Sequence, residues 1–206
     1  MMKLFAAAAT FAAVASIGFA ANASTLYSAP GATGAMATDT SFSDTFFAAG
    51  GPANTSFVID GFNSLDGQNF YEDDFSLSLN GAAILTGTFN LGGGGADVVY
   101  SAPTGASAVN VSGNGLNVTW AGGQVDVSTP LSLVNGPNTL TFAYTSLSDP
   151  SHAGFQGLGD EGWGIEQVSV TSPGGVPETS TWAMVVLGMG GIGYGLRRER
   201  QQRVLA

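Results

Sequence analysis

Short apolar runs separated by Gly, Asn and Pro recur from residue 55 to residue 171, and this pattern restricts the chain to a β fold. Apolar and polar residues alternate within the runs, as in Leu140, Phe142 and Tyr144, which are interleaved with Thr and Ala. Alternation is the period of a strand that buries one face, whereas no run between these residues has the 3.6-residue period of a helix. The sequence therefore predicts an all-β domain, an antiparallel β-sandwich with a jelly-roll-like arrangement.

Two glycine-containing dipeptides mark the turns of expected β-hairpins. Asn80-Gly81 separates FSLSL from AAILTGTF, and Asn-Gly is the strongest short signal for a two-residue hairpin loop. Gly122-Gly123 separates two alternating runs in the same way. Because facing residues of paired strands share one side of the sheet, these loops fix the expected pairs. The expected pairs are Leu79 with Ala82, Leu77 with Ile84, Trp120 with Val125, and Val118 with Val127.

The two ends of the domain carry different signals. Residues 24–54 are rich in Ala, Gly, Ser and Thr and hold few large apolar side chains, so we expect one edge strand at 25–28 followed by loops. In the last strand, the apolar positions change phase after Ile165. This change predicts a β-bulge near Glu166 and Gln167.

Charge is distributed very unevenly along the chain. From Ser24 to Val176 there is no Lys or Arg, against thirteen carboxylates, which are ten Asp and three Glu. A nucleic-acid-binding domain needs cations to neutralise phosphates, so this composition excludes nucleic acid as a partner. The chain also has no Cys, which excludes disulfides and thiolate metal ligands.

The first residues have the three parts of a secretory signal peptide. Lys3 is followed by a charge-free apolar run and then by an A-x-A exit formed by Ala21 and Ala23. This exit predicts cleavage before Ser24. Residues 1–23 are therefore expected to direct the chain to Sec-type export machinery and signal peptidase.

The last residues, 173–206, are expected to form a tail separate from the domain at 24–172. Residues 181–196 carry no charge and would span about 24 Å as an apolar transmembrane helix, against about 30 Å for the hydrocarbon core of a bilayer. Four arginines follow within 197–203. By the positive-inside rule this basic end stays in the cytoplasm, so the domain would lie outside the inner membrane.

This tail resembles the PEP-CTERM sorting signal, in the variant whose helix opens with Trp-Ala-Met. A Pro-Glu motif, the Trp-Ala-Met start, a Gly-rich apolar helix and a terminal arginine cluster occur in this order, although Thr179 stands where a second proline is usual. The resemblance implies a Gram-negative bacterium and an exosortase-type membrane protease that releases the protein to the cell surface or matrix. Residues 157–170 are similar to the closing strand of jelly-roll-like domains with this tail. The matching motif residues are Val176, Pro177, Glu178, Trp182, Ala183, Met184, Arg197 and Arg198.

Many of the domain's carboxylates gather in three segments, where neighbouring charges repel unless they are solvated or bridged by a cation. No Lys or Arg of the domain is available to pair with them. Calcium prefers such hard oxygen ligands. Two interpretations stay open, solvated loops or one or more Ca²⁺ sites. The candidate ligands are Asp60, Asp66, Glu72, Asp73, Asp74, Asp160 and Glu161.

No nucleophile motif or phosphate loop occurs, and the only histidine, His152, stands in a loop sequence. We therefore expect a non-catalytic cell-surface or matrix protein and no enzyme. One alternative is a module that binds carbohydrate such as exopolysaccharide, in which an exposed Trp163, Phe155 or Tyr71 stacks on a sugar ring. Another is an extracellular hydrolase with paired carboxylates. Exposure of Trp163 would indicate a ligand platform, and its burial would indicate core.

Overall fold

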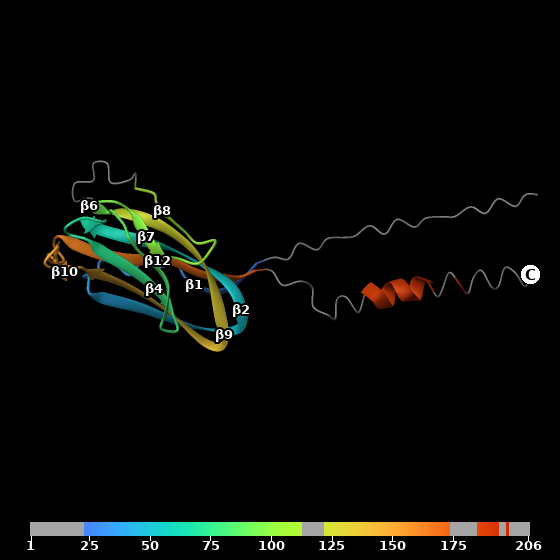
Figure 1. The fold of residues 1–206 in the computed structure, drawn as a ribbon. Helices are drawn as coiled ribbons and strands as arrows, with labels where there is room; N and C mark the ends of the chain where they lie inside the picture. Colours follow the sequence, from blue (N-terminus) through green and yellow to red (C-terminus); the bar gives the residue numbers. More distant parts are fainter. Residues whose placement is uncertain (1–22, 113–121, 174–184, 194–196, 198–206) are drawn as a thin grey trace, which may run out of the picture. The chain divides into compact units, whose positions relative to one another are not determined.

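The computed structural model describes residues 23–112, 122–173, 185–193 and 197 of the chain. Residues Asn22–Gly174 form one unit, and its described part is mostly antiparallel β-sheet (Figure 1). The strands are β1 (Ser24–Ala29), β2 (Thr40–Asn63), β3 (Leu65–Asp66), β4 (Asp73–Leu79), β5 (Ala82–Thr88), β6 (Gly92–Gly94), β7 (Val98–Ser101), β8 (Ser107–Asn110), β9 (Gly123–Ser146), β10 (Ser148–Asp149), β11 (His152–Ala153) and β12 (Glu161–Ser172).

The two longest strands, β2 and β9, form the frame of the domain, and each has 24 residues. They pair antiparallel from Thr40 opposite Tyr144 at one end to Gly61 opposite Gly123 at the other. The main sheet has the order β1-β12-β2-β9-β4-β5-β7, and β8 also pairs with β9. The strands β12, β4 and β8 therefore pair directly with this ribbon, and β1, β5 and β7 extend the sheet beyond them.

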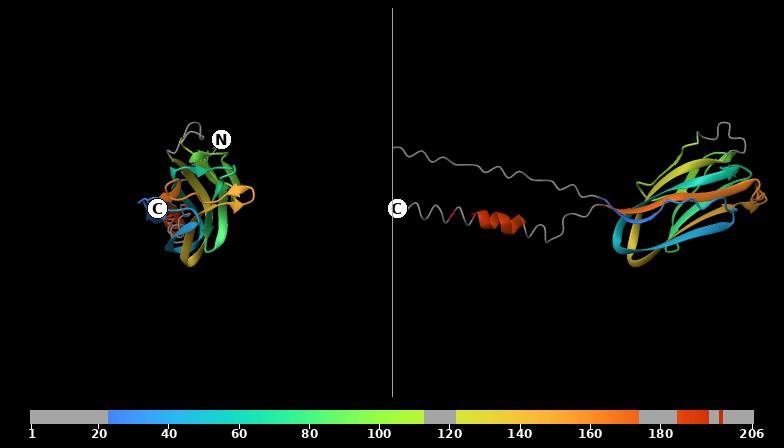
Figure 2. Two further views of the ribbon diagram at one scale, coloured as in Figure 1. Left: turned by 90° about the vertical axis from the view of Figure 1, so that its left-hand side faces the viewer. Right: turned by 180° about the vertical axis from the view of Figure 1, so that it is seen from behind.

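Glycines allow the long ribbon to bend (Figure 2). Gly50 and Gly136 have φ angles of 53° and 107°, in the left-handed region that favours glycine. One half of the ribbon pairs with β12 and β8, and the other half pairs with β4. Phe57 of the first half contacts Phe75 of β4 and Phe142 of the second half, at ring-centroid distances of 5.9 and 5.0 Å. The two halves therefore face each other as the layers of a sandwich-like domain.

The core lies between these layers and follows the alternation of the sequence. Leu140, Phe142 and Tyr144 of β9 are fully buried, as are Phe75 and Leu77 of β4. The residues between them are more exposed. The predicted period-two pattern is confirmed, because alternate side chains of a strand point to opposite faces of the sheet.

The predicted Asn80-Gly81 hairpin connects β4 to β5. Both turn residues have positive φ, 53° and 82°, as a type I′ turn requires. The pair next to the turn forms as expected, but Leu77 lies opposite Leu85 and not opposite Ile84. A bulge inserts one extra residue into β5, which the turn residues alone do not encode.

The predicted bulge in the last strand is confirmed. The pairing of β12 with β2 shifts register between Glu166 and Ser169, and Gln167 has a φ of 55°. Ile165 before the shift and Val168 after it are both buried. The bulge keeps both apolar stretches on the core side.

The expectation of loops up to residue 54 is wrong, because β2 begins at Thr40. Its small polar residues lie on the outer face, where the hydroxyls of Ser43 and Thr141 are hydrogen-bonded at 2.9 Å, while Phe46 is buried. Pairing with β9 satisfies the backbone of this stretch, so a strand forms without a run of large apolar side chains. The expected edge strand is present as β1, at one end of the sheet.

The expected hairpin around Gly122-Gly123 is also wrong. Val125 lies between Ile59 of β2 and Asn110 of β8, so partners from two other strands occupy both of its sides. Local alternation is compatible with several neighbouring strands and does not identify which one pairs with β9. The predicted partners, Trp120 and Val118, lie outside the described residues.

In the tail, residues 185–193 are helical, within the expected helix at 181–196, and Arg197 is helical too. Among the described residues, no helix has both the length and the apolar character needed to cross a membrane. The expected signal peptide lies outside the described residues except for Ala23, and Ser24 opens β1. The sorting-motif residues outside the described part are Val176, Pro177, Glu178, Trp182, Ala183, Met184 and Arg198.

Candidate metal centre

Three buried carboxylates meet in the domain. Asp66 ends β3, Asp73 begins β4, and Glu161 begins β12. Each offers one oxygen atom, and these atoms lie within 4.8 Å of one another. The exposed fractions are 3%, 0% and 0%. Each of the three acidic segments of the sequence contributes one member, which we call the carboxylate cluster.

Backbone and hydroxyl contacts hold the three segments together. The Asp66 N–H donates to Oδ2 of Asp73 at 3.0 Å, and the Thr88 hydroxyl lies 3.1 and 2.7 Å from the carbonyl oxygens of Asp66 and Asp73. The Ser64 N–H donates to the carbonyl oxygen of Asp160 at 2.9 Å, which places Glu161 beside the other two. These contacts link segments that are far apart in the sequence.

The cluster has fewer hydrogen-bond donors than acceptors. The Ser146 hydroxyl lies 2.5 Å from Oδ1 of Asp73 and 3.3 Å from Oε2 of Glu161, but it carries one hydrogen and can serve only one of them. The Gln156 N–H donates to the same Glu161 oxygen at 3.1 Å, and Asn69 donates to Asp66 at 2.7 Å. The other Glu161 oxygen, Oε1, is buried and receives no hydrogen bond from any residue that the structure describes.

Burial makes ionisation of this cluster costly. It raises the pKa of Asp73 to about 7 and that of Asp66 to about 6, and it also raises the pKa of Glu161. Neighbouring carboxylates add to the effect, because like charges disfavour a second ionisation. Since the domain has no Lys or Arg, neutral pH leaves two ways to balance the charge, retained protons or a bound cation.

The donor set and its spacing suit calcium. Ca²⁺ binds carboxylate and carbonyl oxygens at about 2.4 Å, so two ligands on opposite sides of the ion lie about 4.8 Å apart. The cluster offers oxygen ligands only, whereas zinc sites commonly use nitrogen or sulfur. Gly93 also leaves room beside the cluster, because a Cβ at this position would collide with the Asp66 carboxylate.

The other predicted ligands are not members of the cluster. Asp60 accepts a hydrogen bond from Gln124 at 2.8 Å, and Asp160 accepts one from Ser64 at 3.0 Å. Glu72 and Asp74 form a separate pair, in which burial and the neighbouring Glu72 charge raise the pKa of Asp74 to about 6.

Sequence reasoning missed the residues that support the cluster. Ser146 follows Leu140, Phe142 and Tyr144 at the same two-residue spacing and is buried like them. A polar residue at a predicted core position is a signal for a buried polar site, and it was available in the sequence. Thr88 and Gly93 carried no comparable signal, because only the tertiary structure brings them beside Asp66.

Trp163 belongs to the core, so its prediction as a ligand platform is wrong. Its side chain is fully buried, and its ring Nε1–H donates to the carbonyl oxygen of Ala37 at 2.8 Å. Its ring centroid lies 5.8 Å from that of Tyr144. The alternation of β12 places Trp163 on the same inner face as Ile165. Tyr71 and Phe155, the other two candidate aromatics, are exposed by 44% and 40%.

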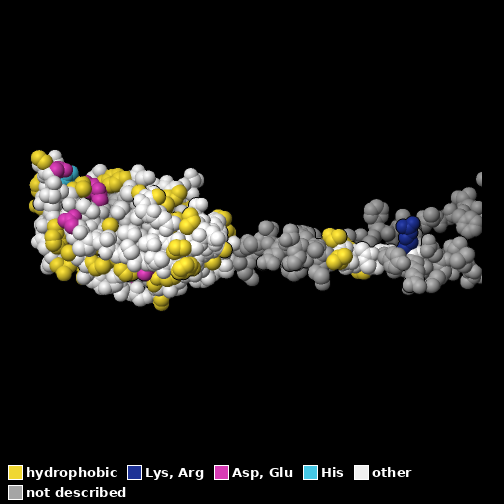
Figure 3. Space-filling view, turned by 90° about the horizontal axis from the view of Figure 1, so that it is seen from below, with side chains coloured by type: hydrophobic (Ala, Val, Ile, Leu, Met, Phe, Trp, Pro, Cys, Tyr) yellow, Lys and Arg dark blue, Asp and Glu magenta, His cyan; other side chains and the backbone are white. Residues whose placement is uncertain are grey.

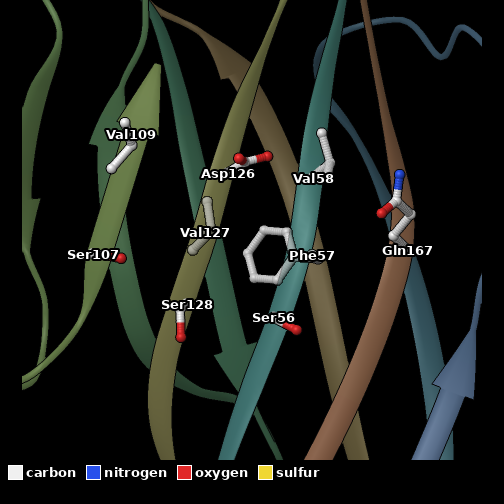
Figure 4. A pocket seen from close by; sticks show the side chains of 9 residues that line it. All are labelled: Ser56, Phe57, Val58, Ser107, Val109, Asp126, Val127, Ser128 and Gln167. Atoms are coloured by element: carbon white, nitrogen blue, oxygen red, sulfur yellow. The ribbon is translucent and has the colours of Figure 1, made fainter. Parts of the chain in front are cut away.

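A shallow groove of about 480 Å³ lies across β8, β9, β2 and β12 (Figure 4). Its single acidic residue is Asp126, and its single aromatic residue, Phe57, is only 2% exposed. The groove therefore presents neither converging carboxylates nor an open aromatic face. It is lined by Ser56, Phe57, Val58, Ser107, Val109, Asp126, Val127, Ser128 and Gln167.

The carboxylate cluster is thus the strongest candidate site among the described residues, and its interpretation depends on its own geometry. Comparison with known proteins finds no family model, no curated protein and no solved structure that matches this chain.

Proposed function

We propose that this chain is an exported, non-catalytic protein of the cell surface or extracellular matrix, whose β-domain is stabilised by Ca²⁺. The ion would be held by Asp66, Asp73 and Glu161. For the sandwich we propose a jelly-roll-like arrangement, which the folded-over β2–β9 ribbon supports.

The observation that carries the cation proposal is the buried Glu161 Oε1, which has no hydrogen-bond donor among the described residues and belongs to a cluster that no Lys or Arg of the domain can neutralise. A buried carboxylate oxygen without a partner costs free energy, and a cation removes this cost. Export to the cell exterior is consistent with a calcium site, because extracellular modules commonly bind calcium at dissociation constants of about 10⁻⁴ to 10⁻³ M.

The burial of the cluster supports a structural ion and not a reacting centre. Asp73 and Glu161 have no exposed surface, so a substrate cannot reach their carboxylates without opening of the domain. The ligands also begin strands β4 and β12, and an ion between them would tie together segments that are distant in the sequence.

Export and sorting are supported by the two ends of the sequence. We expect mature protein recovered from the cell exterior to begin at Ser24 and to lack the terminal arginines, because signal peptidase and an exosortase-type protease remove the two ends. N-terminal sequencing and intact-mass measurement check both ends. A secreted form that retains Met1 contradicts export by a cleaved signal, and one that retains Arg197 contradicts proteolytic sorting.

Calcium should raise the melting temperature of the mature chain by several degrees. An ion bound only to the folded state at 100 times its dissociation constant adds about 2.7 kcal/mol of stability. For a domain of roughly 150 residues this corresponds to a shift of several degrees. Differential scanning calorimetry at about pH 8, with NaCl at matched ionic strength as the reference, measures it.

Two variants that each lose one negative charge distinguish calcium binding at the cluster from general electrostatic screening. Asp73→Asn should abolish the calcium shift, whereas Asp126→Asn, an exposed change outside the cluster, should keep it. Equal shifts in calcium and NaCl, or a full shift in Asp73→Asn, would remove the cation from the proposal.

A further inference from the structure

The turn before Glu72 and the strand β7 carry exposed aromatic side chains. Phe70 is 53% exposed, Tyr71 44% and Tyr100 45%. The rings of Phe70 and Tyr71 lie 5.2 Å apart, nearly perpendicular, and Tyr100 donates its hydroxyl hydrogen to Oε1 of Glu72. We call Phe70, Tyr71 and Tyr100 the aromatic rim. Exposed aromatic surface that is held in place on loops is a common mark of a binding site.

Fixed polar groups stand beside the aromatic rim. The His152 Nε2 lies 3.7 Å from Oε2 of Glu72, and its Nδ1 lies 3.0 Å from the exposed carboxylate of Asp149. The loop of β10 and β11 is attached to the rim by the Ala153 N–H, which donates to the carbonyl oxygen of Phe70 at 2.9 Å. Figure 3 shows acidic and hydrophobic side chains gathered around the single histidine.

Three contacts hold these polar groups in place. Glu72 is 5% exposed, its Oε1 accepts a hydrogen bond from Tyr100, and its Oε2 lies 3.7 Å from the His152 Nε2. Asp149 also accepts a hydrogen bond from the Ser151 N–H at 2.7 Å. A ligand would therefore meet donors and acceptors that are already oriented, which lowers the entropy lost on binding.

We propose that the aromatic rim and the adjacent His152 and Asp149 bind a neutral carbohydrate. A pyranose ring has an apolar C–H face that stacks on an aromatic ring and a border of hydroxyls that both donate and accept hydrogen bonds. The rim offers the first kind of contact, and the exposed Asp149 carboxylate and the hydroxyl of Tyr71 offer the second.

Charge selects among carbohydrates. The domain has no Lys or Arg, so nothing in it pairs with uronate, sulfate or phosphate groups of an anionic polymer. The carboxylates next to the rim would repel such groups. A neutral hexose or pentose chain meets no such barrier.

This inference concerns a surface separate from the carboxylate cluster and stands without the calcium proposal. The test is isothermal titration calorimetry of the mature chain with cellohexaose, mannohexaose, xylohexaose and oligogalacturonate, each in calcium and in EDTA. We expect at least one neutral hexaose to bind and the anionic oligogalacturonate not to bind. Binding of the sugar in calcium and in EDTA alike would show that it needs no bound cation, so a failure of the cation proposal would leave this inference unaffected.

Matched variants locate the binding site. Tyr71→Ala and Phe70→Ala should each weaken binding of the neutral hexaose at least tenfold, while the calcium shift of the melting temperature stays unchanged. Phe47→Ala removes a ring that is 77% exposed on β2 and should leave binding unchanged. All three positions are exposed, so the variants are expected to fold, and circular dichroism checks this.

Several outcomes would overturn the inference. They are no binding of any neutral hexaose, equal binding of oligogalacturonate, or full binding by both rim variants. Sedimentation velocity adds a further outcome. If Phe70→Ala changes the oligomeric state and no sugar binds, the rim is a protein–protein interface and the carbohydrate assignment is wrong.

Discussion

In EDTA the protein will lose stability as the pH rises from about 4 to about 8. The folded state raises the pKa of Asp73 from 3.8 to about 7 and that of Asp66 to about 6, so it binds more protons than the unfolded chain across this range. Stability then falls with rising pH, and it is fully present only below the unfolded pKa values. For Asp73 alone the loss in the free energy of unfolding is on the order of 4 kcal/mol, because each tenfold change in the acid dissociation constant corresponds to about 1.4 kcal/mol.

Calcium should flatten this dependence, because an ion between the carboxylates replaces the protons that leave as the pH rises. Urea unfolding at about pH 5 and about pH 8, with calcium or with EDTA, measures the four free energies of unfolding. The stabilisation by calcium should be larger at the higher pH, where protons no longer compete with calcium for the ligand oxygens.

The variant Asp73→Asn is the control for the pH dependence of stability in EDTA. The variant removes one buried charge, so in EDTA at about pH 8 it should be more stable than the wild-type protein and less dependent on pH. A wild-type protein whose stability in EDTA rises from pH 5 to pH 8 contradicts the assignment of these raised pKa values to the cluster.

Trp163→Ala should destabilise the domain by about 3–5 kcal/mol, through the cavity that loss of a buried Trp leaves. The change also removes the hydrogen bond from the ring Nε1–H to the Ala37 carbonyl, which would be left without this donor. Urea unfolding with calcium present, so that the cation site is occupied in both proteins, is the measurement.

Phe47→Ala is the matched aromatic control, because Phe47 is 77% exposed, and it should cost less than about 0.5 kcal/mol. If Trp163→Ala were as mild as this control, Trp163 would not be a core residue. Its ring would then have to be reconsidered as a ligand platform.

Local signals were sufficient for part of the fold. Asn80-Gly81 identified a turn because both residues tolerate positive φ, and the change of phase after Ile165 identified the bulge at Gln167. Both features depend on neighbouring residues only. The beginning of β2 at Thr40 was missed, because backbone pairing with β9 forms a strand there without a long run of large apolar side chains.

The local sequence pattern also did not determine which strands pair with one another. Val125 alternates correctly for a hairpin with the preceding segment, yet it lies between Ile59 and Asn110. Period-two alternation fixes which face a residue takes and leaves open which strand lies beside it. A single added residue, as in the β5 bulge, then changes every later pair.

The sequence by itself determined the class of the fold, the alternating core of β9 and the absence of cations that makes every buried carboxylate costly. Only the tertiary structure decided that Asp66, Asp73 and Glu161 meet, that Ser146 lies among them, and that Trp163 faces inward while Tyr71 faces solvent. The physical reason is that a metal or ligand site depends on distances between segments brought together by folding. Spacing along the chain does not record those distances.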